Sequence, residues 1–196
     1  MTWIRVDLAT LARRRVMQLR KNEDGATAVE FAIVSLPFLM LLLGTMSVGL
    51  GYFWIFTLEN AVWAASRDLR TGAFQTNSGI YAGLGTAQEK IDKFQEEICA
   101  RTPLKSDCLA NSRVLVQSNA TFNGITAPNC LNNENNLIDK SAADAAFSAG
   151  ASSSVVMVTA CYAWQFGGNL PFLRLGNMAN GSFLIQASAA FRTEPY

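Results

Sequence analysis

The 196-residue sequence contains no histidine, and charged residues make up only 16% of it. Without histidine, a Ser-His-Asp or Cys-His catalytic centre and a histidine-ligated metal site are both impossible. The sequence also has no G-x-S-x-G motif and no C-x2-C spacing. We therefore expect neither an enzyme nor a metal or cofactor site. The net charge of +1 gives no electrostatic reason to expect nucleic-acid binding.

The shortage of charge is concentrated in one segment, residues 31–58, which contains no charged residue. A membrane-spanning helix needs about 20 apolar residues. The segment is too long for a cleavable secretory signal, whose apolar core is about 7–15 residues. We therefore predict a transmembrane span over about 31–52.

Small residues and one proline interrupt this apolar segment. Ser47 and Gly51 form a small-x-x-x-small pair, a pattern that allows close helix packing in membranes. Pro37 and Gly44 add a local change in flexibility or packing. We predict that these four positions shape the contacts of the span.

The helix is predicted to continue beyond the span as an amphipathic half. Apolar residues recur every three or four positions from Ile55 to Leu69, and Gly72 is suited to cap the helix end. We predict one helix over about 27–71, with its second half packed on its own head, residues 72–196. The alternative is a break near Gly51, followed by a separate helix.

The charges on the two sides of the apolar segment predict its orientation. Residues 1–24 carry six basic and three acidic residues, whereas residues 26–196 carry ten basic and twelve acidic ones. Positive flanks of spanning helices remain in the cytoplasm. We therefore expect a single-pass protein with a cytoplasmic N-terminus and its C-terminal head outside the inner membrane, which is the periplasm if the membrane is bacterial.

All four cysteines follow the predicted span and so lie on its oxidising side. An even number of cysteines in such a compartment indicates two disulfides. Of the three possible pairings we favour the one with the shortest loop, Cys99 with Cys108, which leaves Cys130 with Cys161. The alternative is four buried free thiols.

The head combines one predicted helix with predicted strands. Thr86 and Glu89 form a capping-box pattern before a helix at about 87–99. Alternating apolar residues predict an antiparallel sheet on the outer half of the long helix, an α+β fold. The predicted strands are Arg113–Ser118, Ser154–Phe166 and Ser182–Arg192.

Two further segments of the head have open interpretations. Residues 119–136 contain seven asparagines and are predicted to form an exposed loop held by Cys130. A group of large apolar residues is expected to pack against the helix, with an exposed binding patch as the alternative. This group consists of Trp164, Phe166, Phe172 and Leu173.

The segment around Gly25 resembles a prepilin processing site. Basic residues lead to Gly25, and Glu30 stands five residues later, directly before Phe31 and the apolar run. The pattern Gly-Ala-x-Ala-Val-Glu-Phe-Ala, followed by Pro37 and leucines, resembles the TadE-like pseudopilins of the tight-adherence (Tad) pilus, a branch of the type IV pili. The resemblance implies a pilin-like fold, in which a long helix carries a small antiparallel sheet.

The resemblance also implies functional residues and partners. Residues 1–25 would be a leader that a prepilin peptidase removes by cutting between Gly25 and Ala26. Glu30, beside Phe31, would act in assembly. The partners would be the peptidase, other pilin and pseudopilin subunits, the inner-membrane assembly platform and the lipid bilayer, with the extracellular pilus as a further location. The alternative is an uncleaved, single-pass extracytoplasmic binding or adhesion protein.

Overall fold

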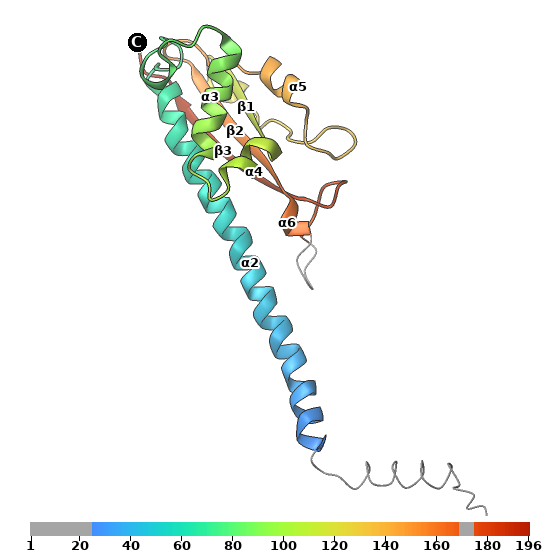
Figure 1. The fold of residues 1–196 in the computed structure, drawn as a ribbon. Helices are drawn as coiled ribbons and strands as arrows, with labels where there is room; N and C mark the ends of the chain where they lie inside the picture. The colour runs from blue at the N-terminus through green and yellow to red at the C-terminus, as the bar shows by residue number, and fades with distance from the viewer. Residues whose placement is uncertain (1–24, 169–174) are drawn as a thin grey trace, which may run out of the picture. The chain divides into compact units, whose positions relative to one another are not determined.

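The computed structural model describes residues 25–168 and 175–196 (Figure 1). The chain divides into two compact units, Met1–Thr45 and Met46–Tyr196, which are described separately below. A long helix, α2 (Ala26–Arg70), precedes a small three-stranded antiparallel sheet. The predicted α+β fold is therefore confirmed, and the predicted leader lies outside the described residues except for Gly25.

The described part of the first unit is the beginning of α2. Its side chains are mostly apolar and exposed, among them Phe31 and Leu41. The hydroxyls of Ser35 and Thr45 donate hydrogen bonds to carbonyl oxygens of their own helix, at 3.2 and 2.9 Å. Such internal pairing allows a polar side chain to lie where no water is available.

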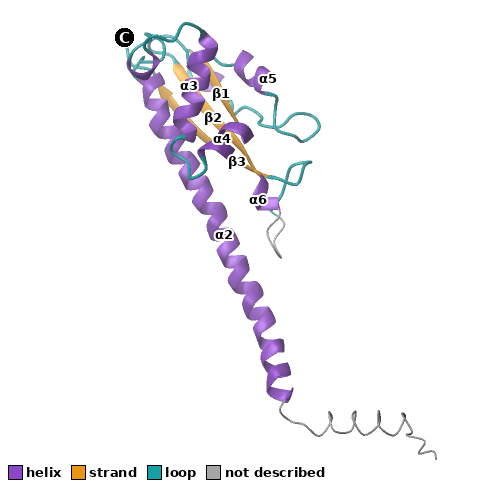
Figure 2. Cartoon of the chain, in the orientation of Figure 1, coloured by secondary structure: helices purple, strands orange, loops and turns teal. Residues whose placement is uncertain are grey.

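The second unit contains the sheet and the remaining elements, coloured by type in Figure 2. The strands are joined in the order β1-β2-β3, and both pairs are antiparallel. The elements in chain order are η2 (Gly79–Tyr81), α3 (Ala87–Cys99), α4 (Lys105–Asn111), β1 (Ser112–Asn119), η3 (Phe122–Gly124), α5 (Lys140–Ala145), β2 (Val155–Trp164), α6 (Gln165–Gly168) and β3 (Phe183–Arg192).

The main core lies between one face of the sheet and two helices. The second half of α2 contributes buried Leu58 and Leu69, and α3 contributes Phe94. Alternate residues of the strands, such as Val158 and Ala187, face these helices because side chains on a strand alternate between the two faces. The buried side chains of α2, which recur about every 3.6 residues, thus pack against the strand side chains, which recur every two residues.

A smaller apolar cluster covers the other face of the sheet. It contains Leu115 of β1, Cys161 of β2, Ala143 of α5 and Cys130 of the asparagine-rich loop. Because β2 is covered on both faces, its residues are buried almost continuously, and the middle of β1 is buried in the same way. On β3 the alternate residues are exposed, which gives the clear two-residue pattern of its sequence.

The predicted elements are present with small changes in their ends. The helix predicted over 87–99 is α3, and its capping box is complete: Glu89 N donates to Thr86 Oγ1, and the Glu89 carboxylate accepts from Thr86 N. The single long helix is continuous, without a break at Gly51. The strand predicted to reach Phe166 ends at Trp164, where α6 begins.

Candidate functional site

The predicted processing site lies where the regular helix begins. Gly25 and Ala26 are exposed, and Ala26 is the first residue of α2. Glu30 and Phe31 follow within the first two turns, and both are exposed. The first N–H groups of a helix have no intrahelical partner, so the Ala26 N–H at this bond is not held by α2 itself.

Pro37 is the only proline inside α2. It has no backbone N–H, so the carbonyl of Ile33 lacks its usual helical donor, and its ring crowds that carbonyl. Helices in water lose about 3 kcal/mol from such a proline. Pro37 therefore marks a locally weakened turn within the apolar segment.

The two small residues predicted to pack other helices are covered within the chain. Ser47 is buried, and a Cβ placed on Gly51 would lie 4.0 Å from the ring of Trp164. Gly44 is half-buried. The helix face that contains Ser47 and Gly51 is therefore covered near Gly51 by a tryptophan of the head of the same chain.

The exposed apolar stretch has the length of a membrane crossing. From Ala26 to Met46 no side chain is buried. These 21 residues extend about 30 Å as a helix, which matches the hydrocarbon thickness of a bilayer. The helix is long and apolar enough to cross a membrane and fits a single-pass anchor. This stretch ends before residue 52, the predicted end of the span, because the head already covers Ser47 and Gly51.

The C-terminal segment closes the end of α2. Glu194 N donates to the carbonyl oxygen of Arg70 at 2.8 Å, and Arg70 Nε lies 3.2 Å from the Glu194 carboxylate. Gly72 has a φ of +80°, and a Cβ there would lie 2.4 Å from the ring of Tyr196. Glycine is required at this helix end for both reasons.

The four cysteines form two bonded pairs in the structure. Cys99 at the end of α3 pairs with Cys108 of α4, with a Cα–Cα distance of 5.5 Å. Cys130 of the asparagine-rich loop pairs with Cys161 of β2, with a Cα–Cα distance of 5.7 Å. These are the pairs favoured from the sequence, and their oxidation in the cell remains a prediction.

Two buried tyrosines bind carboxylates inside the second unit. The hydroxyl of Tyr81 donates to Asp68 at 3.4 Å, and the hydroxyl of Tyr162 donates to Asp107. Burial raises the pKa of Asp68 and of both tyrosines, and the neighbouring carboxylates raise the tyrosine pKa values further. Both hydroxyls therefore stay protonated and act as hydrogen-bond donors that fix α2 and α4.

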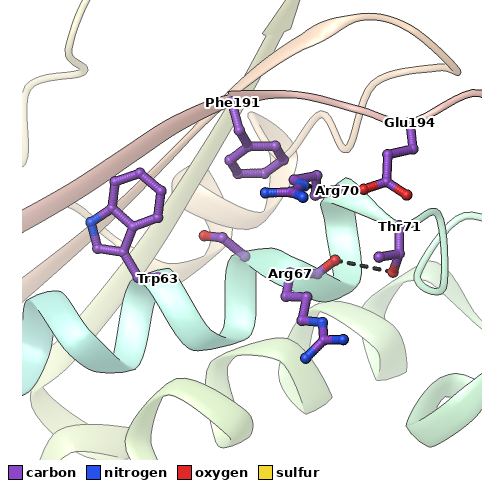
Figure 3. A pocket seen from close by; sticks show the side chains of 7 residues that line it. Trp63, Arg67, Arg70, Thr71, Phe191 and Glu194 are labelled. Atoms are coloured by element: carbon purple, nitrogen blue, oxygen red, sulfur yellow. Dashed lines mark hydrogen bonds and ion pairs between the residues drawn. The ribbon is translucent and has the colours of Figure 1, made fainter.

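A hollow of about 460 Å³ lies at the junction of α2, β3 and the C-terminal segment (Figure 3). We call it the seam hollow. Trp63 of α2 and Phe191 of β3 provide its apolar sides, and the Arg70–Glu194 pair lies at one end. Its lining residues are Trp63, Ser66, Arg67, Arg70, Thr71, Phe191 and Glu194. No signal in the sequence brought these residues together, because they come from two segments far apart in the chain, residues 63–71 and 191–194.

The fold defines a class: an α+β protein with one long, apolar N-terminal helix and a small antiparallel sheet. Residues 25–67 match the model of the family described as TadE-like protein, so this segment is TadE-like, as its residues indicated. The match begins at Gly25 and ends within the head-packed half of α2. It indicates a protein associated with the Tad pilus. Comparison with curated proteins and comparison with solved structures each gave no match.

The described residues do not contain a cluster of three or more cysteine, aspartate and glutamate side chains that could hold a metal ion. The sites that emerge from the structure are therefore the start of α2 and the seam hollow. The sequence indicated the first, and only the fold reveals the second.

Proposed function

We propose that this chain is a minor pilin or pseudopilin that a prepilin peptidase cuts between Gly25 and Ala26, and that it then takes part in assembly of a Tad-type adhesion pilus. One observation carries the proposal: the TadE-like match begins at Gly25, and the regular helix begins at the next residue. On this proposal the role is structural rather than enzymatic. Other pilin subunits and the inner-membrane assembly platform would be its partners.

Glu30 would act after cleavage. It lies in the second turn of an apolar helix, and the next charged residue along α2 is Glu59. A charge at the centre of a bilayer costs about 2.5–3.5 kcal/mol on insertion scales, unless an opposite charge meets it. Cleavage after Gly25 would create such a charge, the amine of Ala26, and on a neighbouring subunit it would pair with Glu30.

The test of processing is the mass of the protein in membranes, with and without a prepilin peptidase. We expect the wild type to be shortened only when the peptidase is present, and Gly25→Leu to stay at full length, because a bulky side chain blocks a narrow subsite. A wild type that is never shortened would instead support the uncleaved anchored protein. Normal shortening of Gly25→Leu would contradict the assigned cleavage site.

The test of assembly compares Glu30→Ala with Glu59→Ala, two exposed glutamates of the same helix. Both variants should be cut and should contain a folded head, because neither glutamate lies in the core. We expect only Glu30→Ala to be strongly reduced in sheared pili. Equal amounts of the two variants in pili, at equal expression, would show that Glu30 has no special part in assembly.

A further inference from the structure

The chain contains two Asn-Gly pairs, Asn123–Gly124 and Asn180–Gly181. In such a pair the backbone nitrogen of the glycine can attack the side-chain amide carbon of the asparagine. Glycine hinders this attack least, because it has no side chain. Both residues of each pair are exposed to solvent. Local sequence and exposure are thus alike, and a difference in reactivity must come from the way in which the fold holds each pair.

The Asn180 pair is held in a turn by both of its reacting groups. Asn180 Oδ1 accepts a hydrogen bond from Ser182 N at 3.0 Å, so the side-chain amide is already bound. Gly181 N donates to the carbonyl oxygen of Met178 at 3.0 Å. Met178 and Ser182 flank the pair and are only 6% and 3% exposed. The turn is therefore anchored on both sides, and reaction requires that these bonds open.

The last part of the asparagine-rich loop holds the same turn from outside. Asn135 O accepts from Ala179 N at 2.9 Å, and Asn135 Nδ2 donates to the carbonyl oxygen of Asn177 at 2.9 Å. Asn135 has a φ of 60°, a left-handed conformation that asparagine adopts more readily than most residues. The loop is itself fixed to β2 by the Cys130–Cys161 pair. Opening of the Asn180 turn therefore also disturbs contacts with a second segment of the chain.

The Asn123 pair is held less firmly. It lies in η3, an isolated 3-10 turn of three residues. Gly124 N donates to Thr121 O at 3.3 Å, and Asn119 Nδ2 donates to Gly124 O at 3.1 Å. Within the part of the chain that the structure describes, the side chain of Asn123 makes no hydrogen bond. Short 3-10 turns have poor hydrogen-bond geometry, and exposed loops open at a low cost in free energy.

We propose that Asn123 is a site of spontaneous deamidation and that the fold protects Asn180 from the same reaction. Gly124 N loses its proton to hydroxide and attacks Asn123 Cγ, which forms an N–Cγ bond and a succinimide ring. The Cγ–Nδ2 bond breaks, and Nδ2 leaves as ammonia after taking a proton from water. Water then opens the ring at either carbonyl to give aspartate or isoaspartate. Nothing is oxidised or reduced: the chain gains one water and loses one ammonia.

The modification would change an uncharged surface. No charged residue occurs between Arg113 and Glu134, so the product would place a negative charge within a neutral segment. An isoaspartate would also lengthen the backbone by one carbon inside the η3 turn. The surface of this loop would thus change with the age of the protein. This inference goes beyond the proposed function and does not depend on cleavage at Gly25.

The test incubates the full chain in detergent and follows both pairs by mass spectrometry of the digested protein, with detection of isoaspartate. We expect product at Asn123 to form at least about tenfold faster than at Asn180, because the additional bonds at Asn180 must open and one or two hydrogen bonds correspond to such a factor. The rate at Asn123 should rise with pH, because hydroxide removes the proton of Gly124 N. In denaturant the two pairs should react at similar rates.

Two variants of the asparagine-rich loop test the protection of Asn180. Asn135→Ala removes the side-chain bond to Asn177, so it should raise the rate at Asn180 and leave the rate at Asn123 unchanged, provided that circular dichroism shows a folded head. Asn133→Ala, which alters another exposed asparagine of the loop, should change neither rate.

Four outcomes would overturn the proposal. The first is an equal or faster reaction at Asn180 in the folded wild type, and the second is no product at Asn123 while the denatured chain reacts there. The third is a difference between the pairs that persists in denaturant, because it would arise from neighbouring residues rather than from the fold. The fourth, an unchanged rate at Asn180 in folded Asn135→Ala, would overturn the protection by the loop.

Discussion

Both halves of α2 are rich in apolar residues, but these residues have opposite surroundings. Leu41 in the first half is 69% exposed, whereas Leu58 in the second half is 1% exposed. The second half is covered by the sheet and α3, but the described residues provide no comparable cover for the first half. Burying apolar surface is the main favourable term in folding. The described part of the head therefore gives the first half no such stabilisation, and in a single-pass anchor lipid or other helices would provide its apolar surroundings.

The largest expected effect is a difference in stability between two leucine-to-alanine variants, one in each half of α2. Leu58→Ala should lower the free energy of unfolding of the head by about 2–5 kcal/mol, because it leaves a cavity in the main core. Leu41→Ala should leave that free energy unchanged. Denaturant unfolding of the full chain in detergent, followed by near-UV circular dichroism, measures both. Equal losses would show that the first half also stabilises the head.

The two disulfides give an intermediate effect that is confined to the head. Chain-entropy estimates give roughly 2.7 kcal/mol for the shorter loop and roughly 3.7 kcal/mol for the longer one. The bonded residues are 9 positions apart for Cys99–Cys108 and 31 apart for Cys130–Cys161. Replacing each pair by serine should therefore destabilise the head more for the second pair.

Before that comparison, thiol labelling of denatured, unreduced protein tests whether the two bonds are present. Four reactive thiols in the wild type would contradict both bonds. Hydrogen exchange then shows which region each bond stabilises. In the serine variants, the backbone amides of the strands should exchange faster than in the wild type, and the exchange rates over residues 31–45 should not change.

The smallest expected effect is a dependence of the stability of the head on pH. Hydrogen bonds from Lys105 and then Lys93 lower the pKa of the partly exposed Glu96 carboxyl to about 2. An unfolded glutamate has a pKa of about 4.3. The contribution of this cluster is therefore fully present above about pH 4.3 and is lost as the pH falls toward 2.

Lys105→Gln tests this cluster. The variant should be slightly less stable than the wild type at pH 6, and the difference should shrink between pH 4.3 and 2. Unfolding midpoints at a series of pH values measure it. Residues 31–45 contain no titratable side chain, so their helical signal should not change over this range. A stability difference that is independent of pH would show that Lys105 acts through packing.

Local patterns were sufficient to predict most of the elements. The apolar run predicted α2, the capping box predicted α3, and the alternation over residues 182–192 predicted the strand that is β3. These signals work because each depends on residues close in sequence. The pairing of Cys99 with Cys108 could be favoured for the same reason, since the two lie only 9 positions apart.

Features that depend on distant contacts were missed or wrong. The short helices α4 and α5 have no long apolar period, and they form where Cys108 and Ala143 reach buried clusters. Phe166 was expected in the core with Trp164, but it is 56% exposed because the strand ends between them. Phe172 and Leu173 lie outside the described residues.

The seam hollow was also beyond sequence analysis. Its residues come from α2, the last residues of β3 and the C-terminal segment, and none belongs to a known motif. The open edge of β3 likewise depends on which strand the chain places last in the sheet. Periodicity predicts that a strand exists, but it does not give the order of strands.

The bond between Glu194 and Arg70 also constrains the order of folding. The two residues are 124 positions apart, so the backbone carbonyl that ends the long helix is paired only after most of the head has been synthesised. Such a contact of high sequence separation forms late, because a large loop must close first. The head therefore completes its packing only when residues near 194 reach the end of the helix, rather than growing outward from the helix alone.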